Sequence, residues 1–246
     1  MKFIKAFLGL LILPFNLRFF NPLSVFKNKR VAIIGAADSA FEKKNGKYIN
    51  EFDIVIRINK AVVNWNEKNE EYLGTKTDVL FHNFYENEHS GGGKLDFSLF
   101  DSRGINYVVN PNSDFSGIRL NYNFYKKYLK WNRTFILQPS LYKKMIQPFG
   151  DLKPTMGYAS LWCALNAPCK EVFITGFTFF KTPYSIGYRD HLVDMKANKK
   201  HLKDQGIHDP NLEYQEFLKL INSIPSSKIH FDKQLQMIVE GSRNEE

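Results

Sequence analysis

The stretch EFDIVIRINKA, residues 51–61, decides which fold the sequence predicts. Its β-branched and apolar residues predict a buried strand over 53–58. Arg57 lies at the end of this strand, and Asn59 follows it directly. An Asn at the carboxyl end of a strand offers a donor and an acceptor, which suit a base edge or a sugar hydroxyl. Arg57 is expected to pair with a carboxylate and hold the turn. For Asn59, these residues alone leave a structural and a ligand-binding role equally open.

Six further runs of the same kind predict strands, at 30–35, 77–82, 105–110, 134–138, 171–177 and 228–231. Between them, helices are predicted at 158–167 and at 211–221, the latter beginning just after Pro210. Strands that alternate with helices predict an α/β fold built on a single, doubly wound, mainly parallel Rossmann-like sheet. Such sheets bind ligands beyond the carboxyl ends of their strands, where Asn59 is expected.

Composition describes an ordinary globular protein of 246 residues, 43% apolar and 24% charged. A net charge of +9 favours an acidic partner, which leaves nucleic acid, an anionic membrane or a phosphorylated substrate open. Nucleic-acid binding is disfavoured because the chain has no aromatic and basic motif of a known kind. Cys163 and Cys169 have no companion ligands at zinc-site spacing, so two free thiols in a reducing compartment are favoured over a disulfide or a metal site.

The first 29 residues predict a segment of their own, ahead of a catalytic domain at 30–240. The apolar run from Ala6 to Phe15 is interrupted by Pro14 and is too short for a membrane span, which needs roughly 20 residues. Cations flank it as in a secretory signal, but no small-residue cleavage site follows. We therefore expect an interfacial segment on anionic lipid. A helix packed on the protein's own surface and a short signal-anchor are the alternatives.

The loop after the first predicted strand of this domain, in VAIIGAADS (31–39), carries Gly35. A glycine there lets the backbone come close to a ligand. No G-x-G-x-x-G dinucleotide motif follows, so a plain strand-to-helix turn is equally compatible with these residues.

Three segments together resemble the motifs of the sialyltransferases. VAIIGAADSAF (31–41) with INEFDIVIRINKA (49–61) resembles the large sialylmotif, and PTMGYASLWCALNAPCKEVFITGF (154–177) resembles the small one. HDPNLE (208–213) fits the very short His-x4-Glu motif. The resemblance implies the GT-A-like variant fold of that family. It also implies a glycosyltransferase that moves a sialic acid from CMP to a glycan.

The resemblance assigns donor-binding roles at the sheet's carboxyl edge to Gly35, Asn59, Thr155, Gly157 and Gly176. The physical basis is clearest for Thr155 and Gly157, because a helix start attracts anions through its free N–H groups and its dipole. Gly176 would let the nucleotide lie against backbone. Arg57 is expected to support Asn59.

The first loop departs from the family pattern. Ala36 and Ala37 stand where the family usually has an Asn, so either Ser39 supplies the polar donor contact or the donor is held differently. These alanines also support an alternative, a non-catalytic nucleotide- or polyanion-binding module of the same fold. Val31 replaces a cysteine that vertebrate-type members use in a disulfide, which points to a bacterial-type enzyme.

Two histidines receive catalytic roles from the resemblance. His208 would be the general base that takes the proton from the acceptor hydroxyl. Glu213 would orient the site or cap the following helix. His191 would support the departing phosphate. The local sequence GYRDHL lacks the usual His-Tyr-Tyr pattern, so Asp190 or Arg189 are alternatives.

No metal or cofactor is expected. The chain has no Asp-x-Asp, and a CMP-sugar carries a single phosphate that side-chain cations and helix N-termini can stabilise. The expected reaction is a single inverting displacement. The donor is CMP-sialic acid or CMP-Kdo, and the acceptor is a glycan or glycolipid such as lipopolysaccharide or capsule. The expected location is the cytoplasmic face of the inner membrane, with the enzyme bound peripherally.

Overall fold

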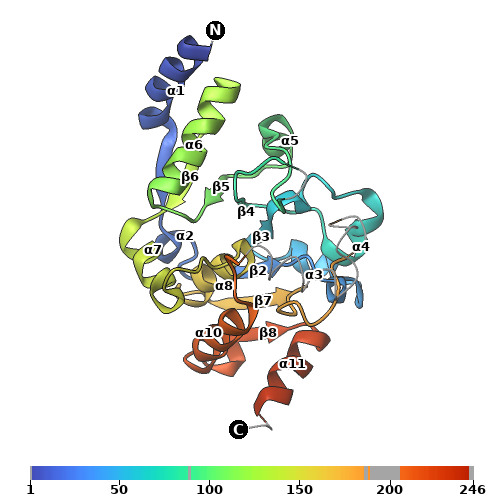
Figure 1. Cartoon of the computed structure of the whole chain (residues 1–246). Helices are drawn as coiled ribbons and strands as arrows, with labels where there is room; N and C mark the ends of the chain where they lie inside the picture. Colours follow the sequence, from blue (N-terminus) through green and yellow to red (C-terminus); the bar gives the residue numbers. More distant parts are fainter. Residues whose placement is uncertain (1, 88–89, 186–187, 189–205, 244–246) are drawn as a thin grey trace.

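The protein folds around one sheet of eight strands, all of them parallel (Figure 1). This computed structural model describes residues 2–87, 90–185, 188 and 206–243. The strands are β1 (Leu17–Phe20), β2 (Arg30–Ile34), β3 (Ile54–Ile58), β4 (Val79–Phe81), β5 (Tyr107–Asn110), β6 (Thr134–Leu137), β7 (Glu171–Thr175) and β8 (Ile229–Phe231). Their spatial order is β1-β6-β5-β4-β3-β2-β7-β8.

The helices that connect and cover the strands are α1 (Lys2–Asn16), α2 (Pro22–Val25), α3 (Gly46–Asn50), α4 (Glu70–Leu73), α5 (Phe97–Ser102), α6 (Phe115–Tyr128), α7 (Pro139–Ile146), α8 (Met156–Leu165), α10 (Pro210–Asn222) and α11 (Lys233–Arg243). All seven predicted strands are confirmed, with ends that move by one or two residues, and so are the two predicted helices, as α8 and α10. The predicted α/β fold with a mainly parallel sheet is therefore confirmed.

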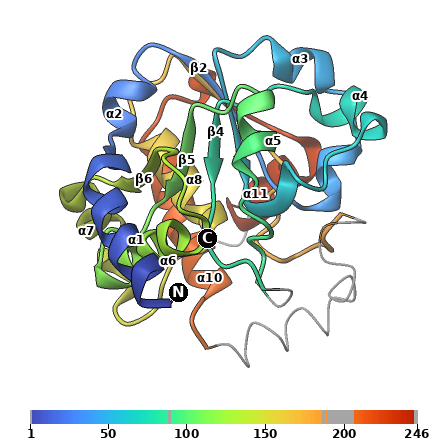
Figure 2. The ribbon, with the colours of Figure 1, turned by 90° about the horizontal axis from the view of Figure 1, so that it is seen from above.

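Helices cover both faces of the sheet (Figure 2). The main core lies between one face and helices α7, α8 and α10, and its centre is α8, from which Leu161, Cys163 and Ala164 are fully buried. On the other face, α5 and α6 pack over β4 and β5, and α3 packs over β2 and β3. Because α8 is apolar all round, it needs protein on every side, and α10 supplies the outer cover.

The sequence analysis missed β1. This strand, LRFF, pairs with β6 at the edge of the sheet, and only Phe20 among its four residues is buried. An edge strand with one buried side chain has no alternation to detect. Phe20 and the later Phe26 are both buried in the main core, so part of segment 1–29 belongs structurally to the same unit as 30–240.

The order of the strands reverses at β2. The chain continues from β2 to β3 on one side, whereas β7 joins β2 from the other side late in the sequence. At such a switch point, the loops that follow neighbouring strands turn away from each other and leave a crevice. Here the loops after β2 and β7 begin with Gly35 and Gly176.

Candidate active site

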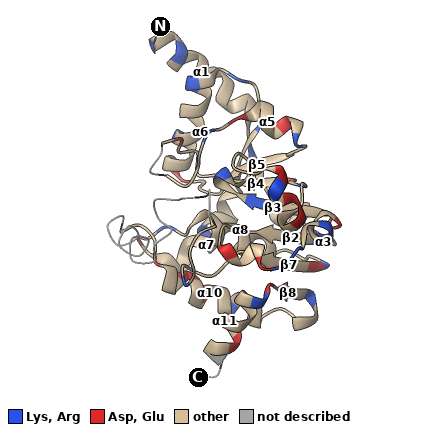
Figure 3. Ribbon diagram, turned by 90° about the vertical axis from the view of Figure 1, so that its right-hand side faces the viewer, with Lys and Arg blue, Asp and Glu red and all other residues tan. Residues whose placement is uncertain are grey.

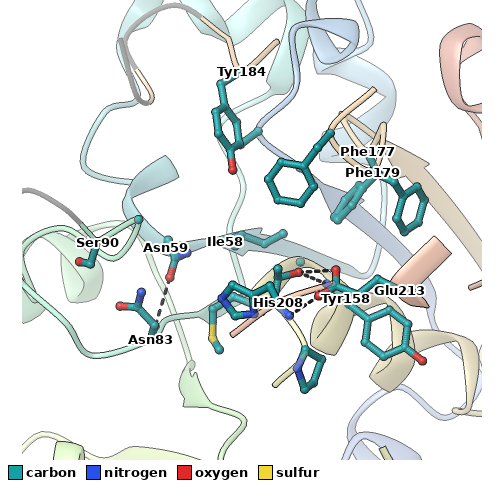
Figure 4. A pocket seen from close by; sticks show the side chains of 18 of the residues that line it. Ile58, Asn59, Asn83, Ser90, Tyr158, Phe177, Phe179, Tyr184, His208 and Glu213 are labelled. Carbon is teal, nitrogen blue, oxygen red and sulfur yellow. Dashed lines mark hydrogen bonds between the residues drawn. The ribbon is translucent and has the colours of Figure 1, made fainter. Parts of the chain in front are cut away.

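A cavity of about 630 Å³ opens at this crevice, beyond the carboxyl ends of the strands. It brings together residues that are far apart in the chain, and several of them are shown in Figure 4. Of the predicted site residues that the structure describes, those that line it are Gly35, Asn59, Thr155, Gly157, Gly176, His208 and Glu213. Asn59, Thr155 and His208, from three different motifs, therefore share one cavity.

Gly35 and Gly176 pack so closely against each other that neither position has room for a side chain. A Cβ on Gly35 would lie 2.1 Å from the carbonyl oxygen of Gly176, and a Cβ on Gly176 would lie 2.9 Å from the backbone of Gly35. Gly176 also has a φ of 74°, a left-handed conformation that favours glycine. Close approach of the protein's own backbone thus explains both glycines, although both also border the cavity.

Asn59 sits at the end of β3 with its backbone in the left-handed region, at a φ of 52°. Its side-chain Oδ1 accepts a hydrogen bond from the N–H of Asn83 at 3.1 Å, which fastens the end of β3 to the loop after β4 (Figure 4). Asn tolerates this conformation better than most residues, because its short side chain can bond to nearby backbone. Its amide group lies at the cavity wall.

Arg57 supports the end of β3, but not through the carboxylate that we expected. Its guanidinium donates to the carbonyl oxygens of Leu73 and Gly74, at 2.6 and 3.0 Å, and to the hydroxyl of Thr77 at 2.9 Å. Burial lowers the pKa of Arg57 to about 10. The expected carboxylate partner is therefore wrong. A buried cation is satisfied here by backbone carbonyls, which leave the turn at 73–77 attached to the strand.

Ser39 lies outside the cavity. It is buried and its hydroxyl donates to Oδ2 of Asp232 at 3.2 Å. The same Oδ2 accepts from the Thr175 hydroxyl at 2.9 Å and from the N–H of Gly176 at 2.7 Å. Ser39 thus stabilises the junction after β7 instead of facing a ligand, and the expected polar contact from this residue does not fit its position.

Thr155 is the N-cap of α8, as the motif predicted, and its side chain accepts from the N–H of Tyr158 at 3.1 Å. The buried carboxylate of Glu213 accepts from the N–H of Thr155 at 2.6 Å and from its hydroxyl at 2.8 Å. Burial raises the pKa of Glu213 to about 7. Glu213 therefore orients the start of α8 from the neighbouring helix α10 (Figure 4).

The next two residues of α8 also border the cavity. Within the part of the chain that the structure describes, the backbone N–H groups of Met156 and Gly157 have no hydrogen-bond partner. Both residues line the cavity. Free N–H groups in the first turn of a ten-residue helix form a binding place for an anion.

His208 stands beside this helix start. Its Nδ1 lies 2.6 Å from the carbonyl oxygen of Lys153. A carbonyl only accepts, so the proton is on Nδ1, and Nε2 keeps its lone pair. Burial lowers the pKa of His208 below its ordinary value of 6.5. The ring is therefore neutral at pH 7 with a fixed tautomer, which is what a general base requires.

A short network holds the carbonyl that orients His208. The Nζ of Lys153 pairs with Asp114, the N-cap of α6, at 3.0 Å and donates to Ser116 at 2.9 Å. Asp114 also accepts from Tyr142 and from backbone, and its hydrogen bonds and the ion pair with Lys153 hold the pKa of its carboxyl at about 2 against the opposing effect of burial.

Several residues of the cavity wall were not identified from the sequence. Asn83 and Asn112 follow the ends of β4 and β5, and Tyr184 and Tyr188 form the wall near Ala36 and Ala37. The two asparagines could have been found from the sequence, because polar residues just after parallel strands lie at the same edge of the sheet as Asn59. The tyrosines lie in a polar stretch without periodicity, so no pattern marked them.

His191, Asp190 and Arg189 lie outside the described residues, and their predicted role stays a prediction. Among the residues that the structure describes, no group of three His, Cys, Asp or Glu side chains is arranged to hold a metal ion. Both cysteines in that part of the chain are free. Burial raises the pKa of the Cys169 thiol to about 12, and that of Cys163 is raised further by the same cause.

The chain was compared with known protein families, curated proteins and solved structures. The sequence model of glycosyltransferase family 29 (sialyltransferase) matches residues 10–224. No curated protein matches the chain at the sequence level.

Solved structures of sialyltransferases share the fold, among them one from a mammal and two from Campylobacter jejuni. A mammalian sialyltransferase superposes with a TM-score of 0.56 at 19% identity, over 94% of this chain and 78% of that one. The monofunctional α-2,3-sialyltransferase Cst-I from Campylobacter jejuni gives 0.51 at 17% identity, over 83% and 76% of the two chains. The sialyltransferase CstII from the same organism, in complex with the substrate analogue CMP-3FNeuAc, gives 0.50 at 18%, over 84% and 87%. Since the family's sequence model matches most of the chain, the protein belongs to glycosyltransferase family 29, the sialyltransferases.

Proposed function

We propose that the protein is an inverting, metal-independent glycosyltransferase that moves a sialic acid from CMP-sialic acid to a glycan acceptor. The observation that carries this proposal is the shared cavity in which a neutral, tautomer-fixed His208 stands beside an anion-binding helix start. A related fold binds CMP-3FNeuAc, a substrate analogue of the same kind. CMP-Kdo shares the cytidine phosphate and the anomeric carboxylate, so it is the second donor to test.

In this proposal the free N–H groups of Met156 and Gly157 bind an acidic group of the donor, either its carboxylate or its phosphate. Glu213 lies next to this position, and its pKa of about 7 means that near neutral pH a large fraction is protonated and does not repel the anion. Asn59 offers its amide to the nucleotide or sugar. Gly35 and Gly176 border the cavity without side chains that would fill it.

The chemical step follows from the position of His208. Its Nε2 takes the proton of the acceptor hydroxyl, the oxygen attacks the anomeric carbon, and the bond from that carbon to the phosphate oxygen breaks with its electron pair leaving on CMP. Attack opposite to the leaving group inverts the configuration. Hydroxyls of Tyr184 and Tyr188 at the cavity wall, together with His191, are placed by this proposal on the departing phosphate. No metal ion takes part.

The acceptor is a glycan, and one relative of the same fold binds a Gal-β-1-3-GalNAc derivative, with a TM-score of 0.54. We place the acceptor on a lipid at the cytoplasmic face of the inner membrane, where the cationic N-terminal segment 1–29 meets anionic lipid. This location rests on the charge and the exposed apolar side chains of that segment.

The experiment is CMP release from CMP-sialic acid, and in parallel from CMP-Kdo, in buffer that contains EDTA. Wild type is expected to turn over, and His208→Ala to be slower by roughly 10²-fold or more, the usual scale for a general base. Lys219→Ala, a change on the exposed face of α10, is the matched control and is expected to keep wild-type rates. Absence of CMP release from both donors in wild type, with or without added glycan, would favour the non-catalytic nucleotide-binding module instead.

A further inference from the structure

Positive charge is distributed very unevenly along this chain. Residues 1–37 contain six Lys and Arg and no Asp or Glu, and residues 115–150 contain seven and none. The rest of the chain carries 21 basic against 25 acidic residues. The whole positive excess of the protein therefore belongs to two acid-free segments that are far apart in sequence.

The fold places these two segments side by side. Strand β1 pairs with β6, and α1 packs along α6 (Figures 1 and 3). The Tyr122 hydroxyl donates to the carbonyl oxygen of Ala6, and Gly9 approaches so closely that a Cβ would lie 2.8 Å from the backbone of Lys126. Because contacts advance in the same direction on both helices, they run parallel, and the first turn of α1 lies beside the first half of α6.

Large apolar side chains are exposed at the start of this helix pair, with cations beside them. Gly9 and Ile12 face inward, and by the helical repeat Phe3 and Phe7 lie on the opposite face of α1. Phe3 is 91% exposed, and Phe115 on α6 is 79% exposed. The docking face, as we call it, consists of exposed side chains around the first turns of the two helices: Lys2, Phe3, Lys5 and Phe7 of α1 and Phe115, Ile118 and Arg119 of α6. By the same repeat Lys2 and Lys5 lie on the side of Gly9, next to α6, so the cations flank the two α1 phenylalanines.

We propose that this docking face binds the surface of an anionic lipid bilayer, so that α6 is part of the membrane contact together with the N-terminal segment. Large aromatic and aliphatic side chains surrounded by Lys and Arg without acids are what an anionic interface attracts. A second copy of the chain is a poor occupant of the same face, because association would bring two acid-free cationic surfaces together. In the described part of the chain, two cations of these segments form ion pairs, Lys127 with Glu86 and Arg30 with Glu171, and both pairs lie outside the docking face. Asp114, the residue before Phe115, has its carboxylate bonded to Lys153, Ser116 and Tyr142.

Helix α6 also connects the docking face to the active site. Ser116 and Leu120 of this helix line the cavity, and its N-cap Asp114 holds Lys153, whose carbonyl orients His208. A protein docked through α6 therefore has one cavity wall at the bilayer surface. We infer that the acceptor is a membrane-anchored glycan that enters along this wall, an inference that rests on the proposed function.

The test measures binding of the full chain to sedimented vesicles of pure phosphatidylcholine and of equal parts phosphatidylcholine and phosphatidylglycerol. We expect binding to the anionic vesicles that weakens as salt increases. The double variants Phe3→Glu/Phe7→Glu and Lys2→Glu/Lys5→Glu, and the single variant Phe115→Glu, should each lower the partition coefficient by about tenfold or more. Met237→Glu and Lys233→Glu, on α11, are matched controls at exposed positions and should bind as wild type does.

Binding of these variants at the wild-type level overturns the docking face. So does a wild-type dimer in gel filtration that the same variants dissociate, because the face would then serve self-association. Vesicle binding is measured without any enzyme assay. Its result therefore tests the docking face independently of the proposed function.

Activity tests the acceptor. Variants of the docking face should release CMP from CMP-sialic acid and glycosylate free lactose at wild-type rates. They should lose about tenfold in rate on a galactose-terminated glycolipid in anionic vesicles. Equal loss on both acceptors overturns the membrane-anchored acceptor, and absence of CMP release from every protein overturns the proposed function alone.

Discussion

Glu213 and His208 come from one short motif, and the fold shifts the pKa values of their side chains in opposite directions. Burial favours the neutral form of each. For the carboxyl of Glu213 this raises the pKa to about 7, and for the imidazole of His208 it lowers the pKa below 6.5. Above the lowered pKa of His208 and below the raised pKa of Glu213, the imidazole is mostly deprotonated and the carboxyl mostly protonated, which is the combination that the proposed reaction needs.

This pair predicts a bell-shaped dependence of kcat/KM on pH. The rate should rise with pH as His208 loses its proton below pH 6.5, and fall as Glu213 ionises near pH 7 and repels the donor anion, by roughly tenfold for a charge a few ångströms away. Glu213→Gln keeps hydrogen-bonding capacity towards Thr155 and removes the titration. Its profile should retain the acid limb and lose the alkaline one.

The control is the acid limb itself, which should be the same in wild type and in Glu213→Gln. An alkaline limb that persists in the variant would show that another group causes it. Loss of the acid limb in Glu213→Gln, with the alkaline limb near pH 7 retained, would contradict the assignment of the base to His208.

At the scale of elements, the end of β2 and the end of β7 form a backbone-to-backbone junction. Gly35 and Gly176 touch, and Asp232 after β8 accepts hydrogen bonds from Ser39, Thr175 and Gly176. Three loops are thereby fixed at the floor of the cavity. Gly35, Gly176 and Ser39, which the sequence analysis assigned to donor binding, therefore have a structural role in this junction.

Gly35→Ala should therefore destabilise the protein. The added Cβ meets a carbonyl oxygen at 2.1 Å, and backbone cannot turn aside as a flexible side chain does. We expect a loss of about 1–3 kcal/mol or more in the free energy of unfolding, measured by urea denaturation. Gly241→Ala is the matched control, because a Cβ there meets nothing within 4 Å, and alanine in a helix should be neutral or slightly stabilising. Equal stability of Gly35→Ala and wild type would mean that the two loops separate freely.

For the whole molecule, the N-terminal region contains two parts with different roles. Lys2–Asn16 forms α1, a helix that is largely exposed, and no helix in the described part of the chain is long and apolar enough to cross a membrane. The following β1 and the segment to Phe26 belong to the sheet and to the main core. The predicted boundary at residue 29 therefore runs later than the point where the chain enters the fold.

Two truncations separate these roles. Removal of residues 1–8 leaves Gly9, Ile12 and β1 in place, so the thermal unfolding transition should stay cooperative while vesicle binding is lost. Removal of residues 1–29 deletes β1 with the buried Phe20 and Phe26, each worth about 3–5 kcal/mol if truncated. That sum is comparable to the whole stability of a typical domain, about 5–15 kcal/mol, so no cooperative transition is expected. A cooperative transition in the longer truncation, followed by circular dichroism, would restore the boundary at residue 29.

The sequence by itself determined the family, the α/β class, seven of the eight strands and the three motifs that meet at the cavity. These features depend on local patterns: apolar runs of strand length, glycines at strand ends and a helix start with a Thr cap, each of which is written in consecutive residues. Only the tertiary structure decided what each residue touches. Arg57 bonds to carbonyls instead of a carboxylate, Ser39 turns inward to Asp232, and α1 joins α6 in one cationic face. Burial, the pKa shifts that follow from it and contacts between distant segments are set by packing in three dimensions, and no stretch of sequence contains that information.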